Sequence, residues 1–331
     1  MRKTVILLLA LCLLCAAVPA LAEEPVRVRV SEVTHSVFYA PQYAAMALGF
    51  FADEGLEIDL MNGGGADKVM TSVLTSEVDI GLAGPEACIY VLLEGRRDAP
   101  RVFAQLTQCD GSFIVGRQAE DFAWQNLRGK TILGGRKGGM PEMTLEYVMR
   151  KNGVIPHEDA TVDTSVQFNM MAGAFVGGEA DYVALFEPTA TEVELAGQGV
   201  VLCSIGEQSG EIPYTAYFAA QSYLTENADT VLRFTRAIAR GQEWVYAHTD
   251  RELAEAIVGY FPDTSVEVLE KVAARYKGIR AWKETPDMKQ EALERLETVM
   301  EQAGELSQRV AYEALVENKF AYHVMAEMGQ K

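Results

Sequence analysis

Strand-type and helix-type patterns alternate along the stretch of chain that follows residue 25. Short apolar runs rich in β-branched residues predict strands, and apolar residues recurring every three to four positions predict helices. Strand and helix are expected in strict alternation over residues 26–30, 41–48, 56–61, 66–75, 78–83 and 85–93. This βαβ rhythm predicts a mostly parallel sheet flanked by helices.

A second stretch repeats the alternation over residues 130–133, 141–152, 161–167, 170–176, 182–186 and 188–195. The likeness extends to single residues. Gly84-Pro85-Glu86 follows the third strand of the first stretch, and Glu187-Pro188 follows the third strand of the second. Each half thus places a carboxylate at the carboxyl end of a strand, where open α/β sheets bind ligands. We expect two lobes facing each other across a cleft.

From about residue 226 helices dominate, over 228–248, 251–259, 265–277 and 288–303, with a last amphipathic segment around Phe320. Thr264 or Ser265 is expected to cap the third of these helices. We expect this block to pack on the first lobe, so that the chain leaves that lobe near Asp110 and returns near Pro213. The predicted organisation is a leader over 1–22, lobe 1 over 23–110, lobe 2 over 111–212, and a return to lobe 1 with C-terminal helices over 213–331.

A glycine-rich run joins the strand at 130–133 to the following helix. Glycine occupies four of the six positions 134–139, and Pro141 suits the first turn of a helix. Free N–H groups at such a start favour partial negative charge. An ordinary βα turn remains the alternative, but the glycine density favours a loop that faces a ligand, with Gly138, Gly139 and Met140 at the site.

The first 22 residues have the pattern of a secretory leader. Arg2 and Lys3 precede an apolar run over 5–17, and Ala20-Leu21-Ala22 supplies the small residues that signal peptidase needs. We expect cleavage after Ala22 and export to the periplasm or the extracytoplasmic side of the membrane. No lipid anchor is expected, because leucine precedes both leader cysteines. No later apolar stretch reaches the roughly 18 residues of a membrane span.

Composition narrows the classes of function. Removing Arg2 and Lys3 takes the formal charge from −18 to −20, and so acidic a surface disfavours nucleic acid and anionic membranes as partners. Only Cys88, Cys109 and Cys203 of the five cysteines survive cleavage, and their spacing fits neither a metal site nor a disulfide framework. Buried thiols are expected. No metal and no cofactor are expected.

Signatures of catalysis are absent from the sequence. There is no serine between glycines of the nucleophile-elbow kind and no His-Glu-x-x-His. Glu86 and Glu187 could form an acid/base pair, but nothing in the sequence fixes their separation. We expect no enzyme and no catalytic residues.

Residues suited to recognition cluster at the expected cleft. Thr34, His35, Phe38 and Tyr39 follow the first strand, and Tyr214 follows the return to lobe 1. His35 is as readily a structural hydrogen-bonding residue as a ligand contact. The expected ligand-binding residues are Thr34, His35, Phe38, Tyr39, Gly84, Glu86, Gly138, Gly139, Met140, Glu187 and Tyr214.

Several motifs together resemble one group of proteins. They are Tyr39-Ala40-Pro41-Gln42-Tyr43, Gly49-Phe50-Phe51, Gly64-Gly65-Ala66-Asp67, Asp79-Ile80-Gly81 and Leu127-Arg128-Gly129-Lys130-Thr131. Over nearly the whole mature chain the sequence resembles the solute-binding proteins of ABC importers, in the group that binds pyrimidine precursors of thiamine and is related to alkanesulfonate and nitrate binders. The resemblance implies a two-lobed fold of the type II periplasmic-binding-protein kind, a monomer, and a membrane permease as partner. Pyrimidine synthases on this fold carry a cysteine cluster that this chain lacks.

The residues leave the solute open between two classes. A sulfonate or nitrate would need donors such as Arg136, Lys137 and the helix start at Pro141. An aminopyrimidine would need aromatic faces and a carboxylate acceptor, which Phe38, Tyr39, Tyr214, Glu86 and Glu187 offer. The second set is more complete, so an aminopyrimidine is expected first and a small organic anion second. A secreted enzyme on the same scaffold is the third possibility.

Overall fold

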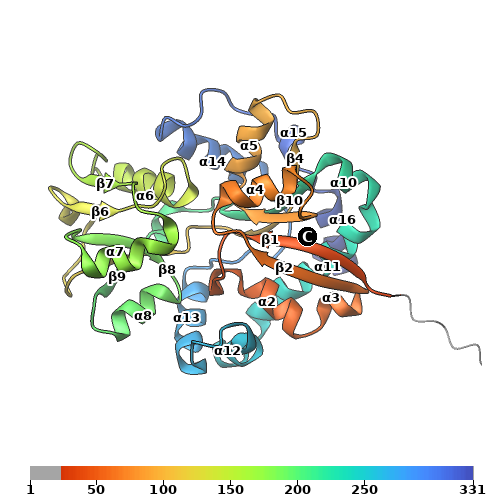
Figure 1. Ribbon diagram of the computed structural model, residues 1–331, viewed down its shortest axis with the longest axis horizontal. Coiled ribbons are helices and arrows are strands. Elements are labelled where there is room, and N and C mark those ends of the chain that lie inside the picture. The colour runs from red at the N-terminus through yellow and green to blue at the C-terminus, as the bar shows by residue number, and fades with distance from the viewer. Residues whose placement is uncertain (1–23, 331) are drawn as a thin grey trace, which may run out of the picture.

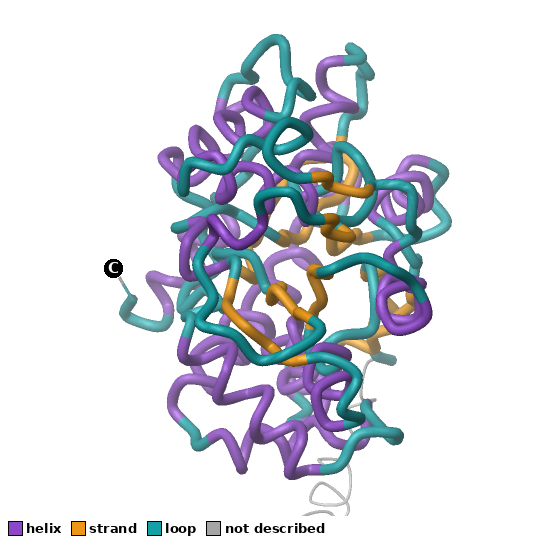
Figure 2. The backbone as a smooth tube through the Cα atoms, turned by 90° about the vertical axis from the view of Figure 1, so that its left-hand side faces the viewer, coloured by secondary structure: helices purple, strands orange, loops and turns teal. Residues whose placement is uncertain are grey.

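The computed structural model describes residues 24–330, so the predicted leader and its cleavage site lie outside the described residues. Two five-stranded sheets lie side by side, each flanked by helices (Figures 1 and 2). The first has the order β2-β1-β3-β10-β4 and the second β7-β6-β8-β5-β9. The expectation of an α/β protein with two lobes is therefore confirmed.

The two sheets share one plan. In the first sheet β1 pairs in parallel with β2 and β3, while β10 runs antiparallel between β3 and β4. In the second sheet β6 pairs in parallel with β7 and β8, while β5 runs antiparallel between β8 and β9. The strands are β1 Val26–Glu32, β2 Leu56–Asn62, β3 Ile80–Ala83, β4 Pro100–Thr107, β5 Ser112–Gly116, β6 Thr131–Leu133, β7 Thr161–Asp163, β8 Tyr182–Phe186, β9 Val200–Ser204 and β10 Thr215–Ala220.

The helices on the first two stretches agree with the sequence pattern to within one or two residues at each end. They are α2 Ala40–Ala47, α3 Phe50–Asp53, α4 Ala66–Leu74, α5 Glu86–Leu93, α6 Met140–Lys151, α7 Met171–Gly177 and α8 Thr189–Leu195, with short turns η1 Val37–Tyr39, η2 Trp124–Leu127 and η3 Phe168–Met170. The strand expected over 161–167 is shorter than predicted. It ends at Asp163, because the Asp163 carboxylate accepts hydrogen bonds from the Ser165 backbone and hydroxyl and turns the chain there.

A short helix, α9 Gly206–Ser209, lies on the return crossing and packs against α6 of lobe 2. The helices that follow cover the first lobe. They are α10 Gln221–Glu226, α11 Ala228–Ala247, α12 Asp250–Ile257, η4 Val258–Tyr260, α13 Val266–Gly278, α14 Gln290–Gln302, α15 Tyr312–Leu315 and α16 Lys319–Glu327. The long helix α11 packs against α2 so closely that a Cβ at Gly241 would overlap the Pro41 carbonyl oxygen. The Ser265 side chain caps α13 by accepting the Val268 N–H. Of the two caps that the sequence offered, Ser265 is therefore the one used, and not Thr264. Within residues 24–330 no helix combines the length and apolar character that a membrane span requires.

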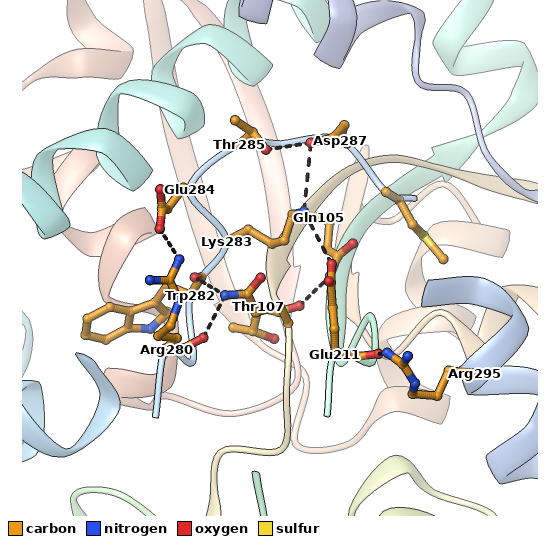
Figure 3. A network of polar contacts seen from close by, with 12 residues as sticks. Gln105, Thr107, Glu211, Arg280, Trp282, Lys283, Glu284, Thr285, Asp287 and Arg295 are labelled. Carbon is orange, nitrogen blue, oxygen red and sulfur yellow. Dashed lines mark hydrogen bonds and ion pairs between the residues drawn. The ribbon is translucent and has the colours of Figure 1, made fainter. Parts of the chain in front are cut away.

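Three segments run between or beside the two sheets. The chain crosses from β4 to β5 at 108–111 and back at 205–214, and residues 281–286 lie alongside both crossings (Figure 3). Backbone N–H groups of Gln105 and Gln108 donate to Pro286 and Ala281, and Lys283 N–H donates to Leu106. The buried Lys283 ammonium lies 3.6 Å from Glu211 and 3.9 Å from Asp287. The crossings include Asp110 and Pro213, and the lobe boundaries expected there from the sequence stay a prediction.

Candidate ligand-binding site

A cavity of about 90 Å³ lies between the carboxyl ends of the two sheets. Lobe 1 contributes the loop after β1, the start of α4, the start of α5 and the start of β10. Lobe 2 contributes the glycine-rich loop, the start of α6, η3 and the end of β8. This is the edge at which parallel strands present ligand-binding loops.

Eight of the residues expected from the sequence line this cavity, and three do not. Those that line it are Thr34, Phe38, Tyr39, Gly84, Glu86, Gly139, Met140 and Tyr214. His35, Gly138 and Glu187 lie elsewhere, as described below. The expectation omitted two aromatic residues of lobe 2, Phe168 and Phe186. Phe186 directly precedes Glu187 at the end of a predicted strand, so side-chain alternation along the strand could have suggested it.

Aromatic rings from both lobes form the walls. The Phe38 ring centroid lies 5.4 Å from that of Phe186 and 5.7 Å from that of Tyr214, and Phe168 lies 5.5 Å from Phe186. Gly111 on the first crossing makes this possible, because a Cβ there would overlap the Phe38 ring. A flat ring of a ligand could stack or pack edge-on against such walls.

Glu86 is the buried charged group of the cavity. Its side chain is 2% exposed and folds back over Gly84, where a Cβ would overlap the carboxylate. Burial raises the pKa of Glu86 to about 7, while its own backbone N–H, the Arg136 guanidinium and the N–H groups of Ala87 and Met140 act to lower it. Oε2 has no hydrogen-bond partner within the described chain. A buried acceptor with no partner is costly, which points to a ligand that donates a hydrogen bond.

Tyr214 is a second polar group without a partner at the cavity. The side chain is 3% exposed and its hydroxyl makes no hydrogen bond of good geometry within residues 24–330. The hydroxyl lies near the Asp110 carboxylate. Oδ1 of Asp110 accepts the Ser112 backbone N–H at 2.6 Å and the Ser112 hydroxyl at 2.5 Å. Burial raises the pKa of Asp110 to about 7, and the Ser112 and Tyr214 donors oppose this rise. The Tyr214 hydroxyl can therefore serve a ligand as donor or acceptor.

Glu187 requires a correction, because its carboxylate does not face the cavity. Oε1 accepts from Arg275 Nη1 at 2.6 Å and from the Thr191 hydroxyl at 2.9 Å, and Oε2 accepts the Thr191 N–H at 2.9 Å. Its backbone carbonyl accepts the Ser36 hydroxyl, and its N–H donates to the Tyr276 hydroxyl. Glu187 therefore joins lobe 2 to α13 and to the loop after β1, and its oxygens are already in use.

His35 and Gly138 also lie outside the cavity lining. His35 Nδ1 lies 3.1 Å from the buried Glu32 carboxylate and Nε2 lies 2.6 Å from the Tyr260 carbonyl. The hydrogen bond with Glu32 raises the pKa of His35. The structural role that the sequence left open is the one seen. Gly138 takes a positive φ of 70° behind the loop, with its N–H on Glu142 and its carbonyl accepting the Tyr90 hydroxyl.

Arg136 is the one cationic side chain that lines the cavity among the described residues, and it is exposed. The cavity's single carboxylate, Glu86, offers no multidentate set for a metal ion. A separate group, Glu142, Glu146 and His157, brings its ligand atoms within 4.8 Å of one another. In this group both oxygens of Glu146 already have hydrogen-bond partners. Oε2 accepts from Arg150 Nη2 at 2.7 Å, and Oε1 lies 2.6 Å from His157 Nε2.

The three cysteines among the described residues are unpaired in the structure. Cys88 and Cys109 are buried and Cys203 is partly exposed. None lines the cavity. Thiol chemistry therefore has no place in the site as described.

Comparisons with known proteins identify the family and the fold. The family model described as "NMT1/THI5 like" matches residues 37–252. The chain is 45% identical to YtlA of Bacillus subtilis, which is named as a binding protein, over 91% of this chain and 90% of that one. It is 24% identical to a Candida albicans protein named 4-amino-5-hydroxymethyl-2-methylpyrimidine phosphate synthase, over 66% of each chain.

Among solved structures, the alkanesulfonate-binding protein SsuA from Xanthomonas axonopodis pv. citri, bound to MOPS, matches with a TM-score of 0.67 at 17% identity. The match covers 90% of this chain and all of that one, which shows a common periplasmic-binding-protein fold. The family match spans more than half of the chain and includes most of the residues that line the cavity. The chain belongs to the NMT1/THI5-like family.

Proposed function

We propose that this chain is the exported solute-binding component of an ABC importer and captures an aminopyrimidine, best a pyrimidine precursor of thiamine, in the cavity between its lobes. The observation that carries the proposal is the Glu86 carboxylate, buried among aromatic rings with one oxygen unpartnered. A ring amine can donate to that oxygen while its flat face packs against Phe38, Phe186 or Tyr214. Tyr214 offers a second polar contact to a ring nitrogen.

One relative supports a binding role, and another supports this class of ligand. YtlA is named as a binding protein, and the more distant Candida albicans relative is named for the synthesis of a phosphorylated aminopyrimidine. Export follows from the predicted leader over residues 1–22, and the permease partner and monomeric state follow from the family resemblance. Lobe boundaries at 110/111 and 212/213 are part of the proposal, with the two crossings and the segment 281–286 as the hinge.

The test is a calorimetric titration of the mature protein with 4-amino-5-hydroxymethyl-2-methylpyrimidine. One site per chain is expected, and mass spectrometry of solute released by denaturing the purified protein should find a compound of the same class. Absence of binding to this compound and to its ring-substituted analogues would contradict the ligand assignment. Ethanesulfonate and nitrate, titrated in parallel, decide the alternative of a small anion.

The anion alternative has specific support of its own. Arg136 and the start of α6 line the cavity and could hold a sulfonate or nitrate. The SsuA structure shows that this fold can take a sulfonate-bearing molecule in a related protein. The unpartnered Glu86 carboxylate opposes this reading, because it would lie close to the anion and the exposed Arg136 would have to compensate both negative charges.

An enzyme on this scaffold is the remaining alternative, because one relative is named a synthase. Steady consumption of 4-amino-5-hydroxymethyl-2-methylpyrimidine, or of any solute found bound, would reveal it. Recovery of the titrated compound unchanged, in amounts equal to the protein, is the outcome expected of a binding protein.

A further inference from the structure

The starts of α5 and α6 both lie at the cavity, and neither helix has a side-chain cap at its own first position. Pro85 and Gly139 stand at the two N-cap positions and make no side-chain hydrogen bond there. The first N–H groups of a helix need acceptors, and the partial positive charge at this end favours an anion. Two such ends facing one cavity, with the Arg136 guanidinium beside them, have the donors that an anionic ligand would use.

A carboxylate of the protein itself lies at these helix starts. Glu86 is the first residue of α5 and Met140 is the first residue of α6. A Cβ at Gly84 would overlap both the Glu86 carboxylate and the Met140 side chain, so the folded-back carboxylate lies beside the start of α6. The nearby N–H groups and the Arg136 charge act to lower the pKa of this carboxyl, against the larger effect of burial. One carboxylate thus lies between the starts of two helices from different lobes.

The same carboxylate retains an unsatisfied acceptor on its cavity side. Oε2 is buried and has no hydrogen-bond partner within residues 24–330. An anion entering the cavity would meet this carboxylate at the helix starts and would be repelled by its charge. A ligand with N–H donors would satisfy it.

We propose that the Glu86 carboxylate, placed at the two helix starts of this cavity with one oxygen unpartnered, determines the specificity of the cavity, excluding sulfonates and nitrate and admitting ligands that donate hydrogen bonds. Removing the carboxylate converts the cavity into an anion site. This inference deepens the proposed function and rests on the same cavity. It assigns to one residue the difference between an anion binder and an amine binder on this fold.

The test compares wild type with Glu86→Ala and Glu86→Gln, using ethanesulfonate and 4-amino-5-hydroxymethyl-2-methylpyrimidine as probes in calorimetric titrations at pH 8. Both variants are expected to bind ethanesulfonate at least tenfold more tightly than wild type and the aminopyrimidine at least tenfold more weakly. Glu86→Gln keeps the shape of the side chain, so it provides the result if the alanine variant does not fold. In the double variant Glu86→Ala/Arg136→Ala the gained sulfonate affinity should fall severalfold.

A matched control is Glu297→Gln, which alters another buried carboxylate, on α14, that is bonded to the Val310 N–H and remote from the cavity lining. It should leave both affinities as in wild type. The proposal is overturned if folded Glu86 variants bind ethanesulfonate no better than wild type, or if wild type binds it as tightly as the variants do. Failure of wild type to bind the aminopyrimidine would refute the proposed ligand, yet a gain of sulfonate binding in the variants would still support the role of Glu86.

Discussion

The carboxyl ends of β3 and β8 are equivalent positions in two sheets of the same plan, and each is followed by a glutamate, Glu86 or Glu187. Both glutamates are almost fully buried. Glu187 is paired with the Arg275 guanidinium and bonded to Thr191, whereas Glu86 has an oxygen with no partner and lies in the cavity. Equivalent topology therefore places one carboxylate at the same edge of each sheet, and the neighbouring side chains decide whether it is paired or left with a free oxygen.

The neighbours come from different parts of the chain. Arg275 is 88 positions from Glu187 and reaches it from α13. Glu86 forms no ion pair within the described residues, and the one cationic side chain that lines its cavity there, Arg136, is exposed. A carboxylate joined to a cation and to hydroxyl donors holds parts of the structure together. A carboxylate left short of donors in an aromatic cavity is ready for a ligand.

The largest expected effect comes from breaking the ion pair between Glu187 and Arg275. Arg275→Ala leaves the Glu187 carboxylate buried without its cation, and we expect the free energy of unfolding to fall by about 3 kcal/mol, less than for a fully buried pair because Arg275 is partly exposed. Urea denaturation of the ligand-free protein is the measurement. Arg309→Ala, which breaks a pair between exposed side chains, is the control and should change little. Equal stability of Arg275→Ala and wild type would refute the structural role of this pair.

The next effect concerns the unpaired carboxylate, Glu86. Because the folded-state pKa of Glu86 is about 7 against 4.5 for the free group, its contribution to stability is fully present below pH 4.5 and is lost as the pH rises to 7. Glu86→Gln has no carboxylate to ionise there and does not suffer this loss. The free energy of unfolding of the variant, relative to that of wild type, should therefore rise by about 2 to 3 kcal/mol between pH 5 and pH 8. Asp110 and Glu142, whose pKa values are also raised to about 7, are present in both proteins and cancel in the difference. A constant difference across this pH range would contradict the burial argument.

The matching substitution of the paired carboxylate, Glu187→Gln, should lower the stability of the protein at pH 8 rather than raise it. Glu187→Gln replaces a charged acceptor of Arg275 by a neutral one, and we expect a loss of about 2 kcal/mol of stability at pH 8. Urea denaturation at pH 8 of Glu86→Gln and Glu187→Gln, side by side, should show the first variant above wild type and the second below it. If both variants shift in the same direction, the two carboxylates do not differ in the way described.

Much of the fold could be predicted from sequence, because the parallel strands and their helices carry local patterns. The strand Tyr182–Phe186 is a continuous buried apolar run, and the helix Ala66–Leu74 buries Val69, Met70 and Val73 at helical spacing. The four strands β4, β5, β9 and β10 have no counterpart in the predicted alternation. All four lie directly before or after a crossing between the lobes and pair antiparallel, and their partners are set by long-range pairing, as Thr215 with Thr107.

The site was predictable to the extent that topology determines it. Glu86, Phe38, Tyr39 and Gly139 follow strands or precede helices at one sheet edge, and all of them line the cavity. Which oxygen stays free depends on side chains distant in sequence, so Glu187 could not be separated from Glu86 before Arg275 was placed. His35 was likewise ambiguous until Glu32 and Tyr260 were seen beside it.

The most direct test of the difference between the two glutamates is a calorimetric titration of wild type, Glu86→Gln and Glu187→Gln with 4-amino-5-hydroxymethyl-2-methylpyrimidine. A charge-assisted hydrogen bond contributes about 1.5 to 3 kcal/mol, and each 1.4 kcal/mol is about tenfold in affinity. Glu86→Gln should therefore bind roughly tenfold or more weakly, while Glu187→Gln stays within about threefold of wild type. Unchanged affinity in Glu86→Gln together with a large loss in Glu187→Gln would contradict the account.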